Sequence, residues 1–215
     1  MPMTDGLDAA RLAICEVGRA MWQRSMVAAN DGNISVRVGD QIVCTPTGVS
    51  KGFLTPEGLT VVGLDGTIIS GANRPSSEVK MHLRVYEVDP QVTAVVHTHP
   101  MFATMMAIQG RSLECRLLPE TIVALPRVPL APYATPSTMA VPDSITDLIA
   151  DNTACLLENH GALTWGSDVF AAYLTMERLE YTAELIWRLD AVGGGRDLPA
   201  DEVERIQQLF GVPRR

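Results

Sequence analysis

The spacing of apolar residues along the chain predicts helices that alternate with short strands. Residues 7–24 carry apolar side chains three or four positions apart, which is the period of an amphipathic helix. The same period predicts a helix of about three turns that opens at residues 75–78 and ends at Asp89-Pro90. We expect further helices at 100–109, 143–150, 168–190 and 201–210.

Short apolar runs bounded by turn residues predict the strands. Gly39-Asp40 and Asp65-Gly66 each separate two such runs, which indicates hairpins over residues 34–45 and 61–70. Two mainly apolar runs predict buried strands. They lie at residues 92–96 and 154–157.

The stretch 111–140 is interrupted by prolines and is expected to be irregular, with strand-like pieces at 122–125 and 127–131. No repeat or composition shift marks a domain boundary. Hairpins mixed with helices favour one α+β domain, in which helices flank a mostly antiparallel sheet.

The composition of the chain says more about its binding partners and its compartment than about its fold. The 215 residues carry a net charge of −8 and no basic cluster longer than Arg214-Arg215, which argues against nucleic acid and anionic membranes. No apolar run approaches the roughly 20 residues of a membrane span, and we expect no signal peptide. The cysteines lack CxxC spacing, so we interpret them as reduced thiols of a cytoplasmic protein. They are Cys15, Cys44, Cys115 and Cys155.

The segment His97-Thr98-His99 ends the run 92–96 and is a candidate half of a metal site. Side chains alternate between the faces of a strand, so both imidazoles share one face. His160 follows the second buried strand and precedes Gly161. Three imidazoles suffice to bind zinc and leave a fourth position open. The alternatives are a solvated face for the pair and a hydrogen-bonded strand cap for His160.

Glu78 lies in the first turn of its predicted helix, where the helix dipole favours a carboxylate. It is therefore either a helix-start residue or, beside a metal, a general base and resting-state ligand. Spacing does not decide between these roles. His82 shares its helix face and could be a further ligand, but three histidines already satisfy a catalytic zinc. A structural role is the expectation for His82.

Three loops could hold an anion, namely Gly32-Asn33, Thr47-Gly48 and Ser76-Ser77. They offer hydroxyls, an amide and free backbone N–H groups, and Ser76-Ser77 also opens a helix. Each signal is weak alone because these residue types populate every turn. Lys51 could add positive charge, although a surface lysine is the default expectation.

Five motifs together resemble the class II aldolase/adducin family in order and spacing, and most of all its fuculose-phosphate aldolase branch. The resemblance covers about residues 7–190. It implies an α/β/α sandwich around an antiparallel sheet, as a single domain over 1–215 with its core at 7–190 and a C-terminal helix at 201–210. It also implies a homotetramer with active sites at subunit interfaces. The motifs are Gly32–Ser35, Thr45–Gly48, Pro75–Glu78, His97–His99 and Asn159–Gly161.

The resemblance implies a lyase that cleaves a ketose 1-phosphate into dihydroxyacetone phosphate and an aldehyde. A zinc ion, or Mn²⁺, Co²⁺ or Fe²⁺, would stabilise the enediolate, and Glu78 would be the catalytic acid/base and a resting-state ligand. The metal ligands would be His97, His99 and His160. The substrate phosphate would be held by Gly32, Asn33, Thr47, Gly48, Ser76 and Ser77.

Other activities of the same family stay open. A methylthioribulose-phosphate dehydratase or a sugar-acid phosphate decarboxylase could use the same residues. Ribulose-5-phosphate 4-epimerases carry Asp where this chain has Glu78, and a non-catalytic adducin-like module would not need the histidines. The fuculose-phosphate aldolases also use two tyrosines that we do not find, because Arg116–Glu120 and Phe210 lie in those regions. The proton donor to the aldehyde is thus unassigned, with Glu120 as a candidate.

Overall fold

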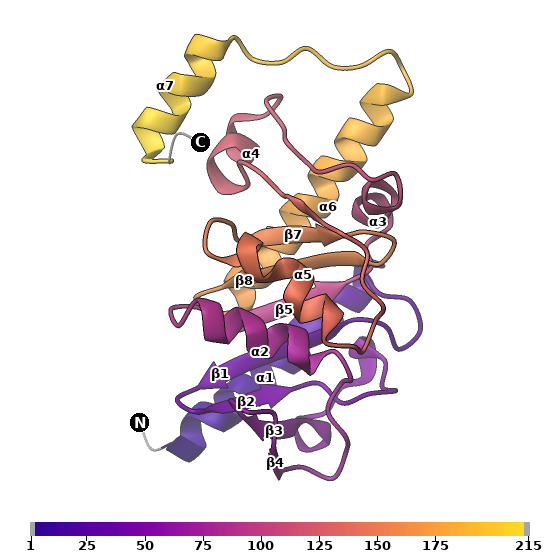
Figure 1. Cartoon of the computed structure of the whole chain (residues 1–215), viewed down its shortest axis with the longest axis vertical. Helices are drawn as coiled ribbons and strands as arrows, with labels where there is room; N and C mark the ends of the chain where they lie inside the picture. The colour runs from indigo at the N-terminus through magenta and orange to yellow at the C-terminus, as the bar shows by residue number, and fades with distance from the viewer. Residues whose placement is uncertain (1–2, 213–215) are drawn as a thin grey trace.

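One eight-stranded sheet forms the centre of the molecule (Figure 1). The computed structural model describes residues 3–212, and their side chains from residue 6 onward. The strand order is β4-β3-β2-β1-β5-β8-β7-β6, and every neighbouring pair is antiparallel except β6 with β7. The strands are β1 (Asn33–Val38), β2 (Gln41–Cys44), β3 (Thr60–Gly63), β4 (Ile68–Ser70), β5 (Ala94–Thr98), β6 (Leu130–Ala131), β7 (Ala154–Leu157) and β8 (Gly161–Gly166).

Helices cover both faces of this sheet. On one face α1 (Met3–Gln23), α3 (Met101–Ile108) and α6 (Val169–Asp190) pack over the first core, and on the other α2 (Val79–Val88) and α5 (Ala140–Ile149) pack over the second. The predicted layered α/β sandwich with a mostly antiparallel sheet is therefore confirmed. The two 3₁₀ turns are η1 (Lys51–Phe53) and η2 (Pro56–Gly58).

The central strand β5 is buried along its whole length and begins with three apolar residues, because both of its faces are covered. Ala94 and Val96 contribute to the first core, whereas Val95 contributes to the second. A strand buried on both faces loses the polar alternation of a half-exposed strand. This explains why residues 94–96 are all apolar, and why His97, which follows them, is fully buried.

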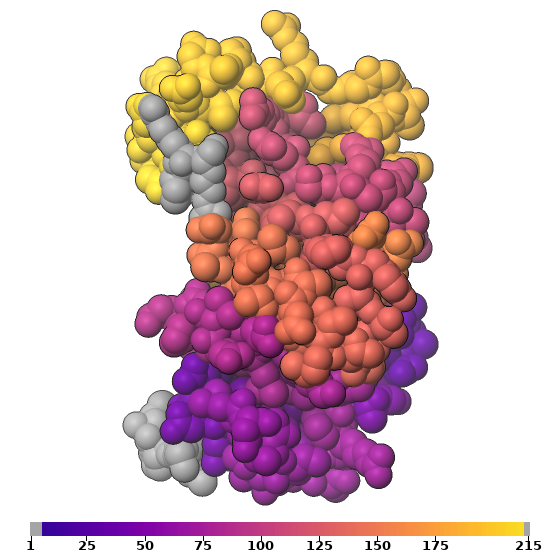
Figure 2. All heavy atoms as spheres, in the orientation of Figure 1, coloured from indigo at the N-terminus to yellow at the C-terminus, as the bar shows by residue number. Residues whose placement is uncertain are grey.

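Helices α4 (Pro119–Ala124) and α7 (Ala200–Phe210) lie together beyond the β6 end of the sheet. In the space-filling view the C-terminal segment forms the end of the molecule opposite the N-terminal hairpins (Figure 2). No helix among residues 3–212 is both long and apolar enough to span a membrane.

One local prediction was wrong, and one strand was not predicted. Residues 122–125 were expected as a strand, but 119–124 form α4, which Pro119 opens at a position that suits its fixed φ. The strand β8 was not predicted, because its glycines at both ends disguise it as a turn region. It pairs with β5 and β7, so tertiary pairing overrides the weak strand propensity of glycine.

Candidate metal centre

The register of the three central strands places the histidines at one edge of the sheet. Asn33, the first residue of β1, lies opposite His97 on β5, and His97 lies opposite Leu163 on β8. His160 occupies the turn that leads from β7 into β8. The end of β5 and the start of β8 thus bring residues 97–99 and 160 together, although about sixty positions separate them in the chain.

Two glycines permit this close approach. A Cβ atom on Gly161 would lie 2.5 Å from the Thr98 carbonyl oxygen and 2.7 Å from Cδ2 of His99. A Cβ atom on Gly32, whose φ is +76°, would lie 2.9 Å from the His97 carbonyl oxygen. Any side chain at either position would push the histidine strand away from its neighbours, which explains glycine in both motifs.

The three imidazoles turn their ring nitrogens toward one another. His97 is fully buried, and its Nδ1 donates to the Ala162 carbonyl oxygen at 2.9 Å. This leaves a lone pair on Nε2, which lies 3.1 Å from Nε2 of His99. The candidate ligand atoms of His97, His99 and His160 all lie within 4.8 Å of one another.

This arrangement fits a metal ion. Two lone pairs that face each other repel unless a cation lies between them. Nitrogen ligands about 2.0–2.1 Å from a tetrahedral zinc are roughly 3.3 Å apart, close to the distance between the two Nε2 atoms. Burial lowers the pKa of His97 to about 3 and also lowers the pKa of His99, so both rings are neutral, as metal ligands must be.

Glu78 faces the histidines from the start of α2. It is the residue immediately before the helix rather than part of its first turn. Its Oε1 lies 3.2 Å from Nε2 of His160 and its Oε2 lies 3.5 Å from Nε2 of His97. The amide of Asn33 donates to Oε2 at 2.9 Å. Burial raises the pKa of Glu78, but His97, His160 and the Asn33 hydrogen bond outweigh it and hold that pKa well below its ordinary value.

Asp31 is a site residue that sequence reasoning missed. Its carboxylate lies 3.5 Å from Nδ1 of His99, on the ring side away from the other histidines. A carboxylate at that nitrogen fixes the tautomer and aims Nε2 at a metal. The available signal was its place directly before Gly32-Asn33, in the turn predicted to hold an anion.

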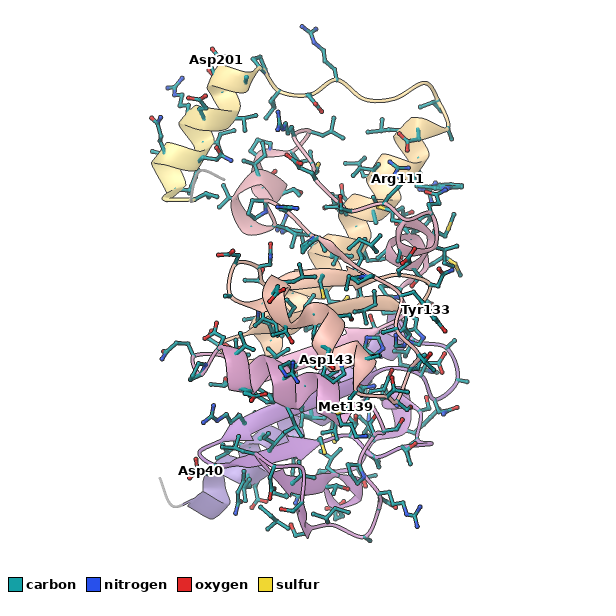
Figure 3. The ribbon with its side chains drawn as sticks, in the orientation of Figure 1. Asp40, Arg111, Tyr133, Met139, Asp143 and Asp201 are labelled. Atoms are coloured by element: carbon teal, nitrogen blue, oxygen red, sulfur yellow. The ribbon has the colours of Figure 1, made fainter. Side chains whose placement is uncertain are left out.

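The predicted anion loops lie side by side. An isolated bridge joins Pro46 to Pro75, and the Ser76 amide donates to the Thr45 carbonyl oxygen at 3.1 Å. Thr47-Gly48 is thereby held next to Ser76-Ser77. Gly32-Asn33 joins the same region, since Asn33 contacts Glu78. The Ser77 hydroxyl accepts from Ser137 at 2.9 Å, so the segment between β6 and α5 also reaches this region. Figure 3 shows Tyr133 and Met139 of that segment.

Three other candidates lie outside the histidine cluster. His82 lies on the buried face of α2, where its Nδ1 pairs with the Ser35 hydroxyl at 2.8 Å. Glu120 is exposed on α4, near α7 (Figure 1). Lys51, expected on the surface, is instead only 1% exposed, because its ammonium group is hydrogen-bonded by backbone carbonyls inside the protein.

Comparison with known proteins identifies the family. Residues 12–187 match the model of the class II aldolase and adducin N-terminal domain. The chain belongs to the class II aldolase and adducin family. The predicted family and the lyase class of its aldolases are therefore confirmed.

Relatives within this family differ in reaction. The chain is 35% identical to the L-fuculose phosphate aldolase of Methanococcus maripaludis over 170 residues, which cover 79% of this chain and 92% of the relative. It is also 35% identical to the 3-oxo-tetronate 4-phosphate decarboxylase of Escherichia coli K12 over 184 residues, which cover 83% and 86%. The structure of YgbL from Escherichia coli has a TM-score of 0.86 and 33% identity, over 94% of this chain and 99% of YgbL.

Proposed function

We propose that this protein is a divalent-metal-dependent aldolase that cleaves a ketose 1-phosphate into dihydroxyacetone phosphate and an aldehyde. The observation that carries the proposal is the position of Glu78. Its carboxylate touches two histidines of a metal-binding triad and is held by Asn33, at the edge of the predicted phosphate loops. The similarity to an L-fuculose phosphate aldolase supports this reaction.

The metal would be held by His97, His99 and His160, with Glu78 as a further ligand before substrate binds. Zinc suits three nitrogen ligands, and Mn²⁺, Co²⁺ and Fe²⁺ also bind imidazole. When bound, the ion supplies Lewis-acid stabilisation of the negative charge that develops as the C3–C4 bond breaks.

Glu78 would carry the proton at carbon. In the cleavage direction the C4 hydroxyl gives its proton to water as the aldehyde forms, and the electron pair of the C3–C4 bond passes to the enediolate. Glu78 then relays one proton from solvent to C3, so no net proton is gained or lost. In the condensation direction the Glu78 carboxylate removes that proton. Asn33 fixes the carboxylate with its amide, which keeps one oxygen oriented while the other exchanges the proton.

The phosphate would be bound by the loops around Thr47-Gly48 and Ser76-Ser77, together with Gly32-Asn33. Their donors are hydroxyl, amide and backbone N–H groups, and Ser76-Ser77 precedes α2, whose positive dipole end favours an anion. These ligands carry no formal charge, so the metal ion and any nearby cation would add to the attraction for a phosphate.

A sugar-acid phosphate decarboxylase is the second candidate. A decarboxylase relative is as similar to the chain as the aldolase relative is. In addition, Arg116–Glu120 and Phe210 occupy the regions where the family tyrosines were expected. Decarboxylation also leaves an enediolate, but its leaving group is CO₂, which takes no proton. A chain that lacks the aldehyde-side tyrosines could therefore still perform it.

We also propose a homotetramer with interfacial active sites, in a reducing cytoplasm. Exposed Phe170, Leu174 and Tyr181 on α6 support a subunit contact, because large apolar side chains on one helix face favour association. All four cysteines are free thiols, as expected in a reducing compartment. Light scattering of the purified protein would test the tetramer.

The deciding experiment mixes the metal-loaded protein with dihydroxyacetone phosphate and a panel of small aldehydes, with metal analysis of the same sample. Formation of a ketose 1-phosphate supports the aldolase. CO₂ release from a 3-oxo-tetronate 4-phosphate without condensation supports the decarboxylase. Loss of water from a ketose phosphate, or epimerisation alone, would reject both.

A further inference from the structure

Lys51 is a buried cation between two of the predicted substrate loops. Its Nζ donates to the Asn30 carbonyl oxygen at 2.8 Å and to the Val49 carbonyl oxygen at 2.6 Å. Asn30 directly precedes Asp31-Gly32, and Val49 directly follows Gly48. One ammonium group thus joins the loop that orients His99 and holds Asn33 to the loop that carries Thr47-Gly48.

The backbone of Lys51 is fixed from the opposite side. A Cβ atom on Gly18 of α1 would lie 2.8 Å from the Lys51 carbonyl oxygen, and one on Gly52 would lie 2.5 Å from the Trp22 ring. Helix α1 and η1 therefore approach each other closely at two glycines. Since its Cα is held by this contact, the Lys51 side chain can hold the two loops at a set distance.

The positive charge of Lys51 is not neutralised locally. Among residues 6–212, no carboxylate lies within ion-pair distance of its ammonium group, although Asp31 and Glu78 are near enough to act through space. A buried charge costs stability unless it serves a partner, and methionine would fill the same space without that cost. Burial lowers the pKa of Lys51 to about 8, while Asp31 and Glu78 oppose that decrease, so the group is mostly charged at neutral pH.

We propose that Lys51 is a positioning residue that sets the spacing of the Asn30–Asn33 and Thr47–Gly48 loops and supplies the buried positive charge that attracts the substrate phosphate. This inference rests on the proposed function of these loops. An acidic protein with uncharged phosphate ligands would then attract an anion through two positive charges, the metal ion and Lys51.

The test measures binding of inorganic phosphate and dihydroxyacetone phosphate to the metal-loaded protein by calorimetry. Lys51→Met keeps most of the side-chain volume but removes the charge and both hydrogen bonds. Lys51→Gln also removes the charge but keeps N–H donors, on a side chain that is one bond shorter. Lys80→Met is the matched control, because Lys80 is the only other lysine and is exposed on α2. Circular dichroism and thermal melts establish that each variant is folded.

We expect both Lys51 variants to bind each anion about tenfold more weakly, because a charge in a dry site acts over several ångströms. Metal content should stay unchanged, and KM should rise more than kcat falls. Lys80→Met should change binding by less than about twofold, since water screens an exposed charge. If Lys51→Met does not fold, Lys51→Gln decides the outcome.

Wild-type anion affinity in a folded Lys51 variant, or an equal loss in Lys80→Met, would overturn the inference while leaving the proposed function intact. Failure of the wild-type protein to bind either anion would overturn both. The two results are distinguishable because the wild-type measurement precedes any comparison of variants.

Discussion

His97 and His82 are two buried histidines with different surroundings. Both are almost fully inaccessible, and burial lowers the pKa of His97 to about 3 and that of His82 to about 4, so both rings are neutral. His97 uses Nδ1 on a backbone carbonyl and turns Nε2 toward two other imidazoles and Glu78. The Nδ1 of His82 pairs with Ser35, and its Nε2 has no hydrogen-bond partner among the described residues.

The comparison shows that burial and pKa do not identify a metal ligand. The two histidines differ in their neighbours. Other imidazole nitrogens and a carboxylate point toward Nε2 of His97, whereas no such group within residues 6–212 points toward Nε2 of His82. The Ser35 hydroxyl of β1 also pairs with the Tyr86 hydroxyl at 2.7 Å, so Ser35, His82 and Tyr86 form a buried polar cluster between β1 and α2. We therefore interpret His82 as structural.

The largest expected effect separates the two histidines directly. His97→Ala should weaken metal binding strongly, because it removes the fully buried imidazole and leaves only His99, His160 and the Glu78 carboxylate, which would then be held as a ligand. Since Lewis-acid assistance contributes several kcal/mol, activity should fall about a thousandfold or more. His82→Leu should bind as much metal per subunit as the wild-type protein does. Metal analysis of both purified variants checks this, and metal loss in His82→Leu would place His82 in the site.

Glu78→Gln should retain the metal and lose turnover. Glutamine has the same shape and can keep the Asn33 contact, but it cannot accept or return a proton. We expect kcat to fall by about 10²–10⁴-fold. Parallel metal analysis is the control. A variant that turns over at nearly the wild-type rate would show that Glu78 is not the acid/base.

Asp31→Asn should weaken metal binding while the chemistry persists at saturating metal. The asparagine keeps the size of the side chain but no longer holds the proton on Nδ1 of His99 by charge. The expected loss in metal affinity is about 10–100-fold. Competition with a chelator of known affinity measures it. Unchanged affinity would mean that the 3.5 Å contact does not orient the ring.

The smallest expected effect concerns stability against pH. The folded pKa of His82 is about 4 and its ordinary value is 6.5, so in acid the unfolded chain takes up a proton that the folded chain refuses. The stability that neutral His82 contributes to the free energy of unfolding is present above pH 6.5 and is lost as the pH falls toward 4. Without metal, the unfolding free energy of the wild-type protein should fall between about pH 7 and about pH 5 by about 2 kcal/mol more than that of His82→Leu. Urea unfolding of both forms tests this. An equal decrease in the two forms would contradict the lowered pKa.

Much of the fold could be predicted from local pattern. The helices over 7–24 and 168–190 and the buried runs 92–96 and 154–157 all occur close to their predicted positions. The errors lie where tertiary contacts decide. Residues 119–124 are helical beside α6 and α7, and 161–166 form a strand because two neighbouring strands pair with them.

The sequence by itself determined those features of the site that lie within one short motif. Period-two spacing placed His97 and His99 together, and the five motifs indicated the family. Only the tertiary structure decided which distant groups join them. It placed Asp31 behind His99 and Glu78 between His97 and His160, and it buried Lys51, because strand register and loop packing fix these distances. No local pattern encodes a contact between residues so far apart in the chain.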